Sequence, residues 1–465
     1  MATVTDGHHV PEPSPMTKAW EYTPGQLVRD GLQRLRVKGQ WYRISLIILA
    51  ILTVIGIIAL IVQAIASGWG DRENWGYVAV AFGYIMSTVA AAPCVCVAGR
   101  LTRSHWRRPI DRISEIWAAA MIVPAVLFLL LMWTVPGTHG RPTIWFGWWA
   151  APYLWDAILV LGLAFTGYAL LYISSIPDLA IARAQVEDGS ANWLTRKAEG
   201  FFGTQSQWRV IERAVAYLGA FYVIMYIGTM TVIAADFIMS LIPGYKSAIF
   251  PAYFAISGFG GGVAVVVVTA SFMRWWGGAD DYLGREQFFA LAKIQLALGL
   301  LFAYFIWTDF VIPWYGRMPW EILQIRLLYF HSYLWYFVVA FALCFISPLV
   351  LLMWTKLRRG RVGPFIVSSG VLIGLLADRI RLFSAAFSPK DITEDRLHAL
   401  PPVFSPGVLD WLIVIGAVAA CVALVMLAMR VIPVPSIWEM TEGTRLRAKR
   451  RYHNVEVIVI GKPDY

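Results

Sequence analysis

Charged residues and cysteine are scarce in this sequence. Asp, Glu, Lys and Arg make up only 15% of the 465 residues, whereas a soluble domain carries about 25%. Hydrophobic residues make up 58%, above the roughly 45–50% of a soluble domain, so the composition predicts an integral membrane protein. The first 40 residues are polar and contain no apolar segment of the kind that a secretory signal peptide requires.

Metal and haem ligands are also few. The four cysteines lie within apolar segments, where we expect small core residues, and Cys94 and Cys96 lack the spacing of zinc or iron–sulfur sites. Of the seven histidines, only His331 falls within an expected helix, whereas a membrane-bound haem b needs pairs of them. The sequence has no phosphate-binding loop. We therefore predict no haem, iron–sulfur cluster or metal in this chain, so a redox role requires partner subunits.

Apolar segments long enough to cross about 30 Å of hydrocarbon occur about ten times. The predicted fold class is an all-α integral membrane protein with about ten transmembrane helices. The expected domains are an N-terminal tail (1–43), a transmembrane domain (44–432) and a C-terminal tail (433–465). The expected spans are 44–66, 76–98, 113–135, 149–174, 210–241, 249–273, 287–312, 328–354, 362–387 and 408–432.

The distribution of basic residues predicts the orientation. The tails and the loops on their side of the membrane hold roughly four times as many Lys and Arg residues as the opposite loops. The net charge of +10 is thus explained by the positive-inside rule rather than by nucleic-acid binding, and both termini are expected in the cytoplasm. The N-terminal tail is expected to be flexible or bound to a partner. Val455–Ile460 (VEVIVI) is a candidate to add a strand to another protein.

Ionisable residues gather in the outer half of the expected spans. A carboxylate at membrane depth costs about 2.5–3.5 kcal/mol on insertion scales, so such residues usually face a partner or a wet cavity. A structural alternative is Asp–Arg pairing between helices, but a group in one layer favours a functional pocket. The group comprises His139 in an outer loop, Asp156, Asp236, Asp309, His331, Asp378, Arg379 and Arg381.

These residue types suit the oxidation of a quinol, which releases two protons and two electrons. A histidine accepts a hydroxyl proton near neutral pH and a carboxylate relays it. An arginine holds that carboxylate ionised or binds a quinone carbonyl. Trp145 and Tyr153 are candidates to pack the ring. On the inner side, Asp178 and Glu212 are candidates for the start of a proton path, and interface charges near Arg183 and Arg213 are the alternative.

Two motifs resemble one family of membrane subunits. Ala235–Tyr245 (ADFIMSLIPGY), followed by Ile249–Phe254 (IFPAYF), resembles the segment between the fifth and sixth spans of the NrfD/polysulfide-reductase family. Thr308–Gly316 (TDFVIPWYG), with Pro319–Glu321 (PWE), is similar to the second signature of that family. The resemblance covers spans 2 to 9 and is greatest to the quinol-binding membrane subunit of alternative complex III. Asp309 departs from the signature, in which an uncharged residue or glutamate is expected.

The resemblance implies an arrangement and a function. It implies two four-helix bundles, about 76–241 and 249–387, flanked by spans 1 and 10. It also implies a quinol site near the extracytoplasmic face, with a quinol of menaquinone type as ligand. His139, Asp156 and Asp236 match the catalytic positions, and Arg379 or Arg381 matches a quinone-binding arginine. Asp309, His331 and Asp378 join Asp178 and Glu212 as candidates for a proton path.

The implied partners are those of a respiratory or photosynthetic complex in the bacterial cytoplasmic membrane. They are a periplasmic iron–sulfur subunit, a homologous membrane subunit and haem c subunits, with no nucleic acid. The chain is thus expected to be an enzyme subunit that is inactive alone. Two alternatives stay open. A secondary transporter also gathers acids within its spans, and the glycines at 258 and 260–262 favour it. A purely structural membrane anchor of the same complex is the other.

Overall fold

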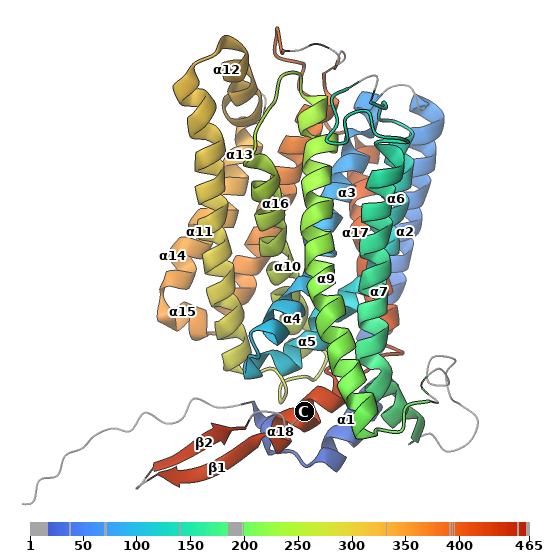
Figure 1. The fold of residues 1–465 in the computed structure, drawn as a ribbon, viewed down its shortest axis with the longest axis vertical. Coiled ribbons are helices and arrows are strands. Elements are labelled where there is room, and N and C mark those ends of the chain that lie inside the picture. The colour runs from blue at the N-terminus through green and yellow to red at the C-terminus, as the bar shows by residue number, and fades with distance from the viewer. Residues whose placement is uncertain are drawn as a thin grey trace, which may run out of the picture.

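Long helices that run between two opposite faces make up most of the structure (Figure 1). The computed structural model describes residues 17–36, 39–68, 72–138, 141–184, 198, 200–331, 333–389, 392, 394, 396–452 and 455–461. One end of the bundle, here called the terminal face, carries the segments nearest the two termini. The opposite end, here called the loop face, carries the loop 133–152 and the short helix α12 (Pro319–Ile325).

The helices follow the apolar segments of the sequence. The long ones are α2 (Gln40–Ser67), α7 (Tyr153–Ala184), α9 (Gln205–Phe237), α10 (Phe250–Trp275), α11 (Arg285–Gly316), α16 (Val362–Phe387) and α17 (Val408–Ala428). Three further segments of membrane length each consist of shorter helices in succession. The first is α3 (Gly76–Thr88) followed by α4 (Ala92–Leu101). The second is α5 (Arg108–Glu115), η4 (Ile116–Ala120) and α6 (Ile122–Met132), and the third is α13 (Leu334–Phe341), η7 (Ala342–Ile346) and α14 (Ser347–Met353).

Among the described residues, nine of these segments are long and apolar enough to cross a membrane. The expected span 362–387 coincides with α16, which is not one of the nine and which holds three charged residues. Most apolar side chains of α2 are exposed, Ile47, Ile58 and Ile65 among them. Such a surface is stable only in contact with lipid or protein. The chain is therefore an all-α multi-pass membrane protein, as its composition predicts.

The expected break between spans 5 and 6 is confirmed. Helix α9 ends at Phe237, a short turn η5 (Met239–Leu241) follows, and α10 begins at Phe250. Gly244 of the Ile-Pro-Gly sequence has φ of +75°, a conformation that glycine adopts without strain. Pro251 lies in the first turn of α10, where its missing N–H has no partner to lose.

Close packing of α10 against α3 and α4 depends on glycine. A Cβ atom at residue 262 would lie 2.7 Å from the Ala91 carbonyl oxygen, so only glycine fits there. Helix α10 also packs against α9, α11 and α16, and α17 packs against α2 and α3. Because α10 continues unbroken through its four glycines, they serve helix contact rather than a broken helix of the transporter type.

Both tails contain ordered structure on the terminal face. In the N-terminal tail, η1 (Lys18–Glu21) and α1 (Pro24–Arg36) pack against α18 (Ile437–Arg445) of the C-terminal tail. The Tyr22 hydroxyl donates to Asp281 at 2.7 Å. The prediction of a flexible or partner-bound tail is therefore wrong for residues 17–36, because their partner is the chain itself. Likewise, strand β2 (Val455–Ile460) pairs antiparallel with β1 (Arg447–Tyr452) of the same chain.

Candidate functional site

Two acids meet near the loop face, and we call them the acid pair. Asp156 lies in the first turn of α7 and Asp236 in the last turn of α9, and these two helices pack against each other. Both side chains are buried, with 1% and 0% exposure. Their carboxyl groups lie close enough to interact with each other. Because two neighbouring negative charges repel each other in a buried site, such a pair favours the state that holds one proton between the two groups.

The loop 133–152 covers the acid pair and supplies its other donors. The indole N–H of Trp145 donates to Oδ1 of Asp156 at 2.6 Å. The backbone N–H of Ile144 donates to Oδ1 of Asp236 at 2.9 Å. Among the described residues, no further donor contacts the Oδ2 atom of either acid. Buried carboxyl oxygens with unused acceptor capacity are suited to receive a hydroxyl group from a ligand.

Arg141 fixes this loop to the end of α9. Its guanidinium group donates to the backbone carbonyls of Pro136 and Asp236 and to the Ser240 hydroxyl, the last at 2.8 Å. A cation at a helix C-terminus is favourable because the last carbonyl groups carry partial negative charge. Burial lowers the pKa of Arg141, and the nearby carboxyl groups of Asp236 and Asp156 oppose this effect. The side chain thus places a positive charge beside the acid pair.

An aromatic stack leads from the acid pair to the surface. The Trp145 ring is stacked on Trp155, with centroids 5.7 Å apart, and both rings contact Trp148. Phe146 and Ala150 have φ of +51° and +55°, which is uncommon outside glycine and asparagine. The loop therefore holds Trp145 in place at the expense of local backbone strain. Tyr153 is oriented differently, because its hydroxyl donates to the Val135 carbonyl at 3.2 Å.

His139 lies outside the described residues, so its predicted place beside the two acids stays a prediction. The described residues 138 and 141 belong to the loop that covers the acid pair.

Arg379 and Arg381 form a second group, here called the arginine group, with Asp378. Both guanidinium groups donate to the Asp378 carboxylate at 2.7 Å, and all three side chains have 0% exposure. Arg379 also donates to the hydroxyls of Ser87 and Ser257. Within the described part of the chain, neither arginine has a hydrogen bond or ion pair with the acid pair. The sequence left structural Asp–Arg pairing between helices as the alternative to a functional pocket. The arginine group is such a pairing, but within one helix, because all three residues lie on α16.

Asp309 is the centre of a third group, made of hydroxyl donors. It accepts hydrogen bonds from Tyr245 at 3.1 Å, from Tyr329 at 2.9 Å and from Ser247 at 2.6 Å. The Arg381 guanidinium lies 4.9 Å from the centre of the Tyr329 ring, so this group adjoins the arginine group. His331 follows Tyr329 by two positions in the sequence, and its side chain is exposed. Its role in a proton path stays a prediction.

Asp178 anchors the C-terminal tail. It accepts hydrogen bonds from the Ser436 hydroxyl and the Trp438 backbone N–H, both at 2.9 Å, and from Arg112 at 3.0 Å. A carboxylate at the start of α18 is favourable because the free N–H groups there carry partial positive charge. The sequence suggested interface charges near Arg183 and Arg213, whereas Asp178 contacts Arg112 and the C-terminal tail. Glu212 is half-buried in the first turns of α9.

Sequence reasoning brought Asp156 and Asp236 together correctly but missed Arg141. Arg141 is not among the residues that the sequence predicts for this site, yet its side chain is 3% exposed and donates to the backbone carbonyl of Asp236. Its position between a glycine and a proline, two residues after His139, was the available signal.

Comparison with known proteins gives no assignment. No protein-family model matches the chain, and no curated protein matches it.

Proposed function

We propose that the chain is the quinol-oxidising membrane subunit of an electron-transfer complex of the NrfD/polysulfide-reductase type, similar to alternative complex III. The observation that carries the proposal is the acid pair. It is buried, it brings two carboxyl groups together, and it lies under a loop at the face opposite the two tails. The contacts of α3 with α6, α7 with α9 and α10 with α11 and α16 are compatible with the two proposed four-helix bundles, and α3 also packs against α10 and α16.

The acid pair has the capacity to take one proton from a quinol hydroxyl. Two neighbouring buried carboxyl groups favour the state that holds one proton between them, and in that state one further proton site is open. His139, which belongs to the same loop as Ile144 and Trp145, is assigned the second proton. Arg141 limits the negative charge of the ionised pair. The two electrons pass to an iron–sulfur centre of a partner subunit, since we assign no redox group to this chain.

The predicted orientation fits this assignment. The excess of basic residues favours a cytoplasmic terminal face, and the proposed complex implies a bacterial membrane. The acid pair then lies near the outer surface, and protons taken from the quinol leave on that side. The proposal leaves Arg379 and Arg381 to a structural or proton-conducting role, because both already bind Asp378.

Purification of the full chain from its native membrane in mild detergent tests the proposal. We expect iron–sulfur and haem c subunits and a second homologous membrane subunit to co-purify, together with quinol-oxidising activity. A chain that purifies alone or as a homo-oligomer, without such activity, would contradict the proposal and favour a transporter. If a complex with these partners keeps full activity when the acid pair is altered, the chain is a structural membrane anchor and does not oxidise the quinol.

A further inference from the structure

A cavity of about 680 Å³ opens on the terminal half of the molecule, far from the acid pair. It lies between the terminal ends of α2, α10 and α17, and its lining is mainly apolar. Its volume is within the range of about 300–1,000 Å³ that is typical of ligand sites. None of the residues assigned to quinol oxidation lines it.

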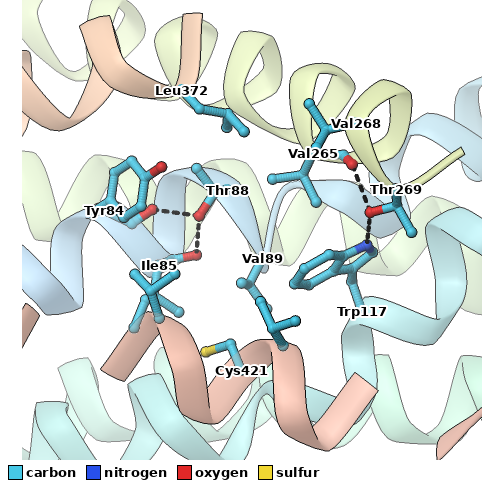
Figure 2. A pocket seen from close by; sticks show the side chains of 12 residues that line it. Tyr84, Ile85, Thr88, Val89, Trp117, Val265, Val268, Thr269, Leu372 and Cys421 are labelled. Carbon is cyan, nitrogen blue, oxygen red and sulfur yellow. Dashed lines mark hydrogen bonds between the residues drawn. The ribbon is translucent and has the colours of Figure 1, made fainter. Parts of the chain in front are cut away.

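A second cavity of about 140 Å³ (Figure 2) adjoins the first. The two share Trp117, Val268, Thr269 and Val422 as lining residues. Along α17 the lining runs from Met429 to Val418, which at 1.5 Å per residue is about 16 Å, or about half of the hydrocarbon thickness. The space is therefore deep and narrow, like the space that a hydrocarbon chain occupies.

The inner part offers little to a polar headgroup. The Trp117 indole N–H donates to the Thr269 hydroxyl at 3.2 Å, and that hydroxyl donates to the Val265 carbonyl (Figure 2). The Thr88 hydroxyl donates to the Tyr84 carbonyl in the same way. Because these polar groups bond one another, the wall that they present is apolar. Apart from the Tyr84 hydroxyl, the hydroxyl and indole donors named here are already used, so this part fits an acyl chain better than a polar ring.

The mouth has the features of a headgroup site. Trp41 and Trp276 line it and are 77% and 71% exposed, as expected for aromatic residues at the level of lipid headgroups. Arg34 lines the same mouth and donates to two backbone carbonyls of the segment that follows α10. The exposed Arg430 guanidinium lies 5.2 Å from the ring of Tyr42, another lining residue. Arg34 is already paired with Asp30 at 2.9 Å, so the exposed Arg430 is the cation that complements an amphiphile with a negative headgroup.

We propose that this cavity binds one anionic glycerophospholipid, with an acyl chain inside and the phosphate beside Arg430. The inference rests on the cavity and its charges alone and does not depend on quinol oxidation. Its lipid would fasten α2 and α17, which pack mainly on each other, to the rest of the helices.

The first experiment counts bound lipid on the full chain purified in mild detergent, by native mass spectrometry with analysis of the extracted headgroups. Val422→Phe fills the neck between the two cavities, and we expect it to remove one phospholipid per chain. Val54→Phe is the matched control, because Val54 is 55% exposed on α2 and does not line the cavity. Arg430→Gln is expected to lower the ratio of anionic to zwitterionic bound lipid at least threefold.

A second experiment needs no variant. Delipidated wild-type protein is titrated with phosphatidylglycerol and with phosphatidylcholine of the same chains, and we expect saturable uptake of one phosphatidylglycerol per chain with weaker uptake of phosphatidylcholine. Equal uptake of both lipids would overturn the proposal. So would an unchanged lipid count in Val422→Phe, or an unchanged headgroup ratio in Arg430→Gln. Displacement of an isoprenoid quinone instead of phospholipid would overturn it as well.

Discussion

Three of the buried acids at the loop-face ends of the helices differ in what surrounds them. Asp236 faces another acid, Asp309 faces three hydroxyl groups, and Asp378 faces two guanidinium groups. Aspartate thus has three different surroundings here. Of the three acids, only Asp236 combines a neighbouring carboxyl group with an oxygen that accepts no hydrogen bond, and we therefore assign the proton chemistry to it.

Replacement of Asp378 should be far more damaging than replacement of Asp309. Asp378→Asn leaves two buried guanidinium groups without a counter-charge, and loss of one partner of a buried ion pair costs about 3–5 kcal/mol. In Asp309→Asn the amide oxygen can still accept from Tyr245 and Tyr329, which both donate to Oδ2, and the amide N–H can donate to the Ser247 hydroxyl. We therefore expect a cost below about 2 kcal/mol. Thermal unfolding of both variants in detergent gives the comparison. Equal stability of the two would contradict the paired role of Asp378.

At the scale of elements, the run of glycines in α10 gives a test with an internal control. An alanine at residue 262 would place its Cβ 2.7 Å from the Ala91 backbone, whereas at residue 260 the nearest atom is 3.7 Å away. We expect Gly262→Ala to destabilise the protein by about 1–3 kcal/mol. Gly260→Ala should be neutral or slightly stabilising, because alanine favours helix. Unfolding midpoints in detergent measure both, and a tolerated Gly262→Ala would contradict the close approach of α10 and α4.

Helix α18 is held by charge, so its attachment should depend on pH. Burial alone would raise the pKa of Glu439, but Arg100 and Arg107 outweigh this effect and hold the pKa below its ordinary value. A lowered pKa in the folded state stabilises the fold above the ordinary pKa of about 4.3. This stabilisation is lost as the pH falls toward the lowered value. Hydrogen exchange of residues 437–445 should therefore increase below about pH 4.

The control for this pH effect is Glu439→Gln, which removes the titrating group and leaves the shape nearly unchanged. In that variant, exchange of α18 should already be faster at neutral pH, and less of the increase on acidification should remain. If wild type and variant show the same exchange at both pH values, the charge of Glu439 does not hold α18.

For the whole molecule, the sequence predicts the helices better than the partners of individual side chains. Apolar length alone locates the membrane segments, because hydrocarbon thickness imposes it. The meeting of Asp156 and Asp236 follows from their equal depth in helices of opposite direction. The arginine group could not be predicted, because the sequence does not say whether Arg379 turns toward Asp378 or toward another helix. The contacts of the C-terminal tail could not be predicted for a related reason, because Glu439 pairs with Arg100 and Trp438 donates to Asp178, both far away in sequence.

Quinol oxidation by the assembled complex with Asp236→Asn tests the central claim most directly. The variant keeps the size of the side chain and removes one carboxylate from the acid pair. We expect the rate to fall at least about 100-fold, as for loss of a general base, with the subunit composition unchanged. Asp410→Asn is the matched control, because Asp410 is also buried at a helix start on the loop face, where it accepts from the Gly407 N–H. A near wild-type rate in Asp236→Asn would remove the acid pair from the reaction.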